Sequence, residues 1–181
     1  EVTANLEKYE LGIALQKVYE FIWEEFCDWY IELVKPRLYD KDSAGRLEAQ
    51  YILNKVLCDS MKLLHPFMPF VTEEIYQSLY NNDESIMIAK WPVFSDEQVY
   101  EKEEETLRFV MEAIRGIRNA RAEMNVPPSR KAKIIVVSQD SNVRKIAGDS
   151  NTYFQKLANA SEIEVLAEET GIPKGAVAVV M

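Results

Sequence analysis

Cysteine and histidine are scarce in this chain of 181 residues, which holds two cysteines and one histidine. Cys27 and Cys58 each lie inside a helical apolar pattern, and no His or Cys stands near them at the spacing of zinc ligands. His65 lies beside a proline between two apolar segments and has no visible partner for acid–base chemistry. We therefore predict two buried thiols, a packed or capping histidine, and no metal site.

Long apolar runs are also absent. No run of about 18 uncharged apolar residues occurs, so the sequence predicts no membrane-spanning helix and no membrane partner. No basic segment followed by an apolar stretch opens the chain, which argues against a secretory signal, and we expect a cytoplasmic location. The chain opens at Glu1 without a methionine and stops within a strand-like pattern, so we expect both ends to belong to a longer polypeptide.

Catalytic motifs are missing as well. The chain has no P-loop, no Gly-rich dinucleotide turn and no nucleophile elbow. Adjacent carboxylates occur at residues 24–25, 73–74 and 103–105, but on a helix surface such groups usually face solvent. We therefore expect no catalytic residue, no bound cofactor and no enzyme acting alone.

Positive charge is in short supply, because the formal net charge is -9. That balance argues against a nucleic-acid binder, which depends largely on Lys and Arg at the phosphates. Residues 106–133 are the exception, with seven cations against two carboxylates. Such asymmetry permits an oriented contact with a polyanion, although a solvated helix face explains it about as well.

Apolar residues at helical spacing are abundant. Residues 11–34 carry them in steps of three and four, which predicts one long helix. The first stripe is formed by Leu11, Leu15, Val18, Ile22, Phe26, Trp29 and Leu33. The second stripe is formed by Tyr19, Trp23, Phe26, Tyr30 and Val34. Together they widen the apolar arc, so we expect this helix to be central in a bundle and to end at Pro36.

Three further helices are predicted. One covers residues 43–64 and is broken by the sequence HPFMP at 65–69, and the next begins at Pro69 and ends in a loop at residues 81–83 (NND). Ser95 and Gln98 form a capping-box pattern for a long fourth helix, which the sequence NVPP at 125–128 stops.

The fourth helix has a heptad-like apolar seam. The seam is formed by Thr106, Val110, Ala113, Ile117, Ala120 and Met124. At about 100° per residue, Arg108, Arg115 and Arg118 point away from this seam and Arg121 lies on their flank. We expect these arginines to face solvent or a partner.

After this helix the periodicity changes. Residues 134–137, 163–166 and 176–180 predict strands, and residues 143–157 predict one broken helix or two short ones. The predicted fold is mainly α, a helical bundle over residues 1–128 with a small α/β subdomain over residues 129–181.

Four blocks of sequence resemble, in the same order, the anticodon-binding helical bundle of the valyl-tRNA synthetases, which are class I aminoacyl-tRNA synthetases. The blocks are residues 26–36 (FCDWYIELVKP), 63–70 (LLHPFMPF) with Glu73-Glu74, 85–92 (SIMIAKWP) and 117–129 (IRNARAEMNVPPS). The Pro-Phe-Met-Pro turn and the later Trp-Pro are shared with leucyl, isoleucyl and methionyl relatives. The first and last blocks favour the valyl family.

The resemblance implies activity only within a larger enzyme. In that family, activation of valine with ATP and magnesium depends on a His-Ile-Gly-His signature and a Lys-Met-Ser-Lys-Ser loop, and this sequence has neither. The editing domain, the first helices of the bundle and the C-terminal coiled-coil arm are also absent. The implied partners are valine-specific tRNA, held at its anticodon loop, and other domains of the same synthetase.

The resemblance also implies candidate tRNA-binding residues. Ile31 is the best matched candidate for contacting an anticodon base, with Trp29 and Tyr30 as its neighbours, because unpaired bases stack on aromatic or apolar side chains. Packing in the core is the competing role for Trp29 and Tyr30. The candidates for phosphate contacts are Arg115, Arg118 and Arg121, against the alternative of a solvated helix face.

Two other interpretations stay open. One is the equivalent domain of a leucyl or isoleucyl relative. The other is a helical protein-interaction domain that never binds RNA, for which the acidic charge and the apolar stripes would suffice.

Overall fold

A computed structural model describes residues 1–80, 85–127, 129–169 and 171–180, without the side chain of Tyr80. The chain divides into two compact units, Glu1–Asp96 and Glu97–Met181. Helices predominate and the sheet is small, so the predicted mainly α fold with a small α/β part is confirmed. The predicted domain boundary at residue 128 stays a prediction.

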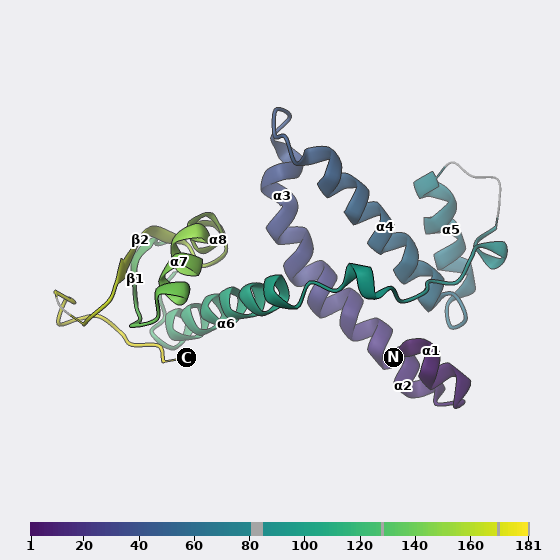
Figure 1. Cartoon of the computed structure of the whole chain (residues 1–181), viewed down its shortest axis with the longest axis horizontal. Helices are drawn as coiled ribbons and strands as arrows, with labels where there is room; N and C mark the ends of the chain where they lie inside the picture. Colours follow the sequence, from purple (N-terminus) through teal and green to yellow (C-terminus); the bar gives the residue numbers. More distant parts are fainter. Residues whose placement is uncertain (81–84, 128, 170, 181) are drawn as a thin grey trace. The chain divides into compact units, whose positions relative to one another are not determined.

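One continuous helical rod dominates the first unit. It follows the short helix α1 (Val2–Glu7) and consists of α2 (Leu11–Glu20), the π-helical segment η1 (Phe21–Ile31) and α3 (Glu32–Tyr39) (Figure 1). The predicted long helix is therefore present, but its middle is π-helical. A π-helix closes its hydrogen bonds one residue further along the chain than an α-helix, so its faces drift from the 3.6-residue period used for the prediction.

Pro36 does not end this rod, as the sequence predicted, but lies inside α3. A proline within a helix costs about 3 kcal/mol, because it removes one hydrogen bond and crowds the preceding turn. Leu33 and Val34, just before it, are both buried. Burying two such side chains contributes about 1.5–3 kcal/mol each, which is enough to offset the proline.

The rod is less enclosed than its wide apolar arc predicted. Helices α1 and α4 (Arg46–Leu64) pack against α2, yet Tyr19 and Trp23 remain 60% and 58% exposed. Their rings stack on each other, with centroids 6.3 Å apart. The expectation of a helix buried on most sides is therefore wrong at this end, and holds further along at Phe26 and Trp29.

The remaining helices of the first unit begin and end close to the turn and proline residues of the sequence. Helix α4 begins three residues later than predicted, because residues 40–46 form turns, and it ends before the His65–Pro69 turn. Helix α5 (Pro69–Tyr80) begins at Pro69 as predicted and packs on α4. The predicted loop at residues 81–83 lies outside the described residues. Cys58 is buried, whereas Cys27 is only half-buried.

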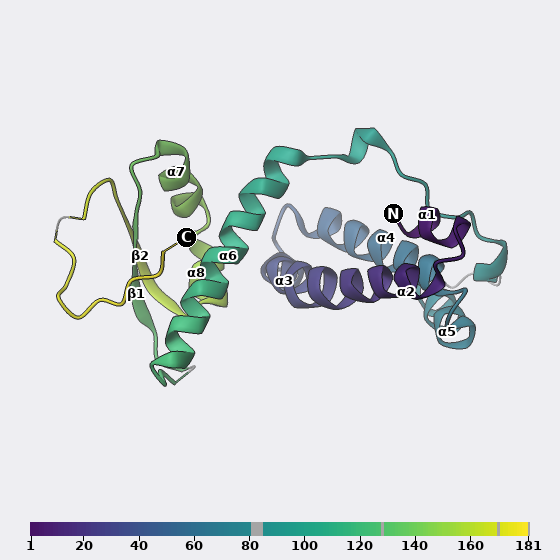
Figure 2. The ribbon, with the colours of Figure 1, turned by 90° about the horizontal axis from the view of Figure 1, so that it is seen from below.

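The second unit combines a long helix with a βαβ motif. Helix α6 (Glu101–Glu123) precedes β1 (Ala132–Val137), α7 (Ser141–Asp149), α8 (Asn151–Leu157) and β2 (Ala160–Leu166). The strands are parallel, with Ile134 opposite Ile163 and Val137 opposite Leu166. Figure 2 shows the two strands side by side, with the connecting helices packed against them. Two predicted strands and the two short helices are thereby confirmed.

The start of the long helix α6 differs from the sequence prediction. Ser95 does not cap the long helix, because a 3-10 turn (Asp96–Gln98) intervenes and Tyr100 precedes α6 in a non-helical conformation. Glu101, Glu103 and Glu104 fill the first turn of α6, where negative charge favours a helix start.

The predicted strand at residues 176–180 does not form. Instead, the segment passes over α6 at Gly116, where a Cβ atom would lie 2.7 Å from Cγ1 of Val179. A strand needs an edge partner in register, and here Val179 lies against the helix instead, while Val180 is 93% exposed. The absence of a side chain at Gly116 is what permits this close approach.

Candidate nucleic-acid interface

Trp29, Tyr30 and Ile31 lie together at the end of the π-helical segment η1. Trp29 is 6% exposed and belongs to the core of the first unit, while Tyr30 and Ile31 are half-buried. The Tyr30 ring stacks on Phe26, one turn earlier, with centroids 5.9 Å apart and planes 16° from parallel. Of the three, Tyr30 and Ile31 therefore keep surface that a partner can reach.

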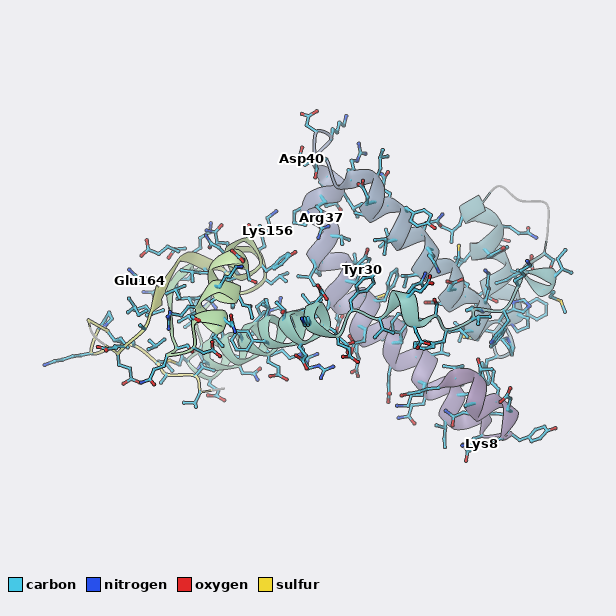
Figure 3. All side chains as sticks on the ribbon, in the orientation of Figure 1. Lys8, Tyr30, Arg37, Asp40, Lys156 and Glu164 are labelled. Carbon is cyan, nitrogen blue, oxygen red and sulfur yellow. The ribbon has the colours of Figure 1, made fainter. Side chains whose placement is uncertain are left out.

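Arg37 lies two helical turns beyond Tyr30 on the same rod, as Figure 3 shows. Burial raises the pKa of the Tyr30 hydroxyl, and the charge of Arg37 opposes that rise. The tyrosine is thus a neutral hydroxyl donor at physiological pH, with a guanidinium close enough to act on it. Sequence reasoning did not single out Arg37, although a separation of seven residues on a helix places two residues on nearly the same face.

The three candidate arginines lie on α6, in the second unit. Arg118 donates from Nε to the Leu157 carbonyl oxygen at 2.7 Å. Arg121 donates from one terminal nitrogen to the Pro127 carbonyl oxygen at 3.2 Å and to that of Arg130. Arg115 is exposed. Two of the three side chains therefore connect α6 to neighbouring segments, and a role for all three at phosphates stays a prediction.

Polar groups near the α4–α5 turn serve packing. His65 lies at the end of α4, and its Nδ1 is 2.7 Å from Oγ1 of the buried Thr72, which confirms the packed or capping histidine. Glu73 was expected to be merely solvated, but it accepts hydrogen bonds from Ser85 Oγ at 2.7 Å and from the Ile86 amide at 3.2 Å. The hydrogen bond from Ser85 is the main cause that lowers the pKa of Glu73.

A surface hollow between residues 1–2 and the middle of the rod has an acidic lining. Its volume is about 460 Å³, and its lining includes Glu1, Glu20, Glu24 and Glu25 against one cation, Lys17. Carboxylates repel phosphate, so this hollow is unsuited to RNA. Among the residues that the structure describes, no group of three or more His, Cys, Asp or Glu residues could hold a metal ion. No described helix is both long enough and apolar enough to cross a bilayer.

Comparison with known proteins gives a family. The anticodon-binding domain of tRNA ligases matches residues 1–136. Valine–tRNA ligase of Clostridium perfringens is 52% identical over 182 aligned residues, which cover 100% of this chain and 20% of that protein. Valine–tRNA ligases of Clostridium tetani and Geobacillus stearothermophilus are 49% and 41% identical over 99% and 95% of this chain, and 20% and 19% of their own lengths.

The chain thus spans about a fifth of the length of these relatives. The family match covers all the described helices of the first unit, α6 and most of β1. It includes both η1, with its reachable tyrosine and isoleucine, and the arginine-bearing α6. The chain belongs to the family of anticodon-binding domains of tRNA ligases.

Proposed function

We propose that this chain is the anticodon-binding part of a valine–tRNA ligase and that the end of η1 contacts the anticodon loop of valine-specific tRNA. The observation that carries the proposal is the relatedness to valine–tRNA ligases along almost the entire chain, at up to 52% identity. The placement of Tyr30 and Ile31 supports it, because unpaired bases are bound by stacking and by contacts to their edges.

The π-helical stretch lends the proposal physical support. Such segments are rare, occur mostly as single widened turns, and are frequent at functional sites. Here the π-helical segment is 11 residues long and ends at Ile31, one residue after the Phe26–Tyr30 stack. The stack fixes the orientation of the Tyr30 ring in advance, which reduces the conformational entropy lost when a base binds.

The remaining steps of the reaction belong to the longer enzyme in this proposal. Activation of valine with ATP and magnesium, and its attachment to tRNA, would take place on domains outside this chain, in the cytoplasm. The chain contributes selection of the tRNA and orientation of its distant acceptor end. An isolated chain with a net charge of -9 should bind tRNA weakly.

Two assays on the full-length enzyme test the proposal. Charging assays with valine, leucine and isoleucine should show stable attachment of valine alone, and stable attachment of leucine or isoleucine would assign a different synthetase. Nuclease footprinting of valine-specific tRNA should show protection of the anticodon loop. A tRNA that binds with its anticodon loop unprotected would contradict the proposed role of this chain.

A further inference from the structure

Two arginines meet where the helical rod turns back. Arg37 lies near the end of α3, and Arg46 is the first residue of α4. A Cβ atom on Gly45 would lie 3.5 Å from Cδ of Arg37, so the stem of Arg37 lies across the residue just before Arg46. The turn therefore brings two guanidinium groups to the same end of the first unit.

Neither arginine is neutralised by the protein. Among the described residues, no hydrogen bond or ion pair involves the side chain of Arg37 or Arg46. Arg46 Nε is buried without a hydrogen-bond partner. Of the nearby groups, Lys35 is already paired with Glu32, and Asp40 already accepts the Asp42 amide at 3.1 Å. Asp40 and Asp42 keep their charge in this turn, but neither forms an ion pair with Arg37 or Arg46. An anionic partner can therefore pair directly with both guanidinium groups.

Two exposed aromatic residues lie on the same two helices as these cations. Tyr39 is 78% exposed at the end of α3, and Tyr51, in the second turn of α4, is 69% exposed. Cations interleaved with exposed rings are the combination that single-stranded nucleic acid requires, since cations hold the phosphates and the rings stack on bases. The hollow lined by Glu1, Glu20, Glu24 and Glu25, nearer the middle of the rod, has the reverse charge.

We propose that Arg37, Tyr39 and Arg46 form a hairpin-end surface that binds the sugar-phosphate backbone of the anticodon arm beside the bases contacted by Tyr30 and Ile31. The proposal rests on the function proposed above and adds the residues that hold the phosphates. Arg37 and Tyr30 follow one another along the same rod (Figure 3), so one RNA strand can contact both. Arg118 and Arg121, which donate to carbonyl oxygens, have the lesser role at phosphates.

The salt dependence of tRNA binding by the full-length enzyme tests this surface. Each phosphate contact steepens the dependence of log affinity on log salt by about 0.7 for a single strand. Arg37→Gln should therefore lower the slope by about 0.7 and weaken binding about fivefold near 0.1 M salt. The variant with both Arg37→Gln and Arg46→Gln should lose about 1.4 of slope. Arg37→Lys should restore most of the slope, because it retains the charge.

A matched control is available in the same unit. Lys8→Gln removes the same charge at an exposed position near the other end of the rod (Figure 3). It should leave the salt slope equal to that of the wild type and the affinity within about twofold of it. Circular dichroism should show native helix content in each variant. Arg46 Nε is buried, so Arg46→Gln also perturbs the turn. The salt slope of the single variant Arg37→Gln, at an exposed position, is therefore the decisive measurement.

The outcomes separate the two proposals. If wild-type enzyme protects the anticodon loop and Arg37→Gln leaves both slope and affinity unchanged, the hairpin-end surface is wrong and the proposed function stands. If Lys8→Gln lowers the slope as much as Arg37→Gln, the effect is general charge and the surface is again wrong. If wild-type enzyme does not protect the loop, the proposed function itself fails.

Discussion

The arginine side chains have different partners in the two units. In the second unit, the cations Arg118 and Arg121 donate to backbone carbonyl oxygens of Leu157 and Pro127. In the first unit, the carboxylate of Glu73 accepts from the side chain of Ser85 and the backbone of Ile86. Arg118 and Arg121 therefore form internal contacts in the second unit. In the first unit lysines form the ion pairs, while Arg37 and Arg46 form none with described residues.

This difference shows why charge counts alone misdirect a search for RNA contacts. The excess of cations in residues 106–133 made α6 the natural candidate, and the sequence does not show that Arg118 and Arg121 bind carbonyl oxygens. The shorter segment from Lys35 to Arg46 has four cations and two carboxylates, and its charge count alone did not mark it as a candidate RNA contact. Whether a cation is available depends on its hydrogen-bond partners, which only the fold supplies.

The largest expected effect on stability comes from Arg121→Ala. The substitution leaves the carbonyl oxygens of Pro127 and Arg130 without their charged donor, and we expect a loss of about 1.5 kcal/mol in the free energy of unfolding. Urea denaturation of the 181-residue chain measures it, and hydrogen exchange should increase around residues 124–132. A loss below about 0.3 kcal/mol would mean that Arg121 is not an internal connector, and the contrast between the units would fail.

A smaller effect is expected at Glu73, and it depends on pH. Hydrogen bonds lower the pKa of Glu73 below its ordinary value of 4.5, so its contribution to stability is fully present above that pH. The contribution is lost as the pH falls through the lowered pKa of the folded state. Glu73→Gln should therefore lower Tm at pH 7, and the difference from wild type should shrink toward pH 3.

The control for this prediction is Glu74→Gln, which removes the charge of the neighbouring carboxylate and leaves the hydrogen bonds from Ser85 and Ile86 to Glu73 in place. A Glu73→Gln difference that is equal at pH 7 and pH 3 would show that the carboxylate does not hold the Ser85–Ile86 segment through its charge.

The smallest effect on stability is expected from Arg37→Gln. The side chain is exposed and makes no hydrogen bond or ion pair with described residues, so the free energy of unfolding should change by less than about 0.5 kcal/mol. The same urea titration measures it beside Arg121→Ala. A loss as large as that of Arg121→Ala would place Arg37 among the internal connectors and remove the reason to assign it to RNA.

Local patterns predicted much of the fold. Apolar spacing and the positions of the prolines predicted the rod, the start of α5, the two paired strands and their connecting helices. These patterns failed where a contact between residues far apart in the sequence sets the local conformation. Residues 176–180 have strand propensity, but Val179 lies against α6 at Gly116 instead. The π-helical winding of residues 21–31 does not follow from apolar spacing, which was matched to the 3.6-residue period of an α-helix.

The candidate site was predictable only in part. The resemblance drew attention to Trp29, Tyr30 and Ile31, and the fold separates buried Trp29 from its two reachable neighbours. Arg46 joins Arg37 only because the chain reverses between α3 and α4, which no spacing along the sequence reveals. Contacts formed across a turn need coordinates, whereas contacts along one helix follow from its period.

A site-specific cross-link tests the central claim most directly. Tyr39→p-benzoylphenylalanine places a photoreactive group at the exposed end of α3, and the same substitution at Tyr9, which is exposed near the other end of the rod, is the control. After irradiation of the full-length enzyme with valine-specific tRNA, the probe at residue 39 should attach to nucleotides of the anticodon arm, and the probe at residue 9 should not. Cross-links from residue 39 to the acceptor arm, or none in a complex that forms normally, would contradict the account.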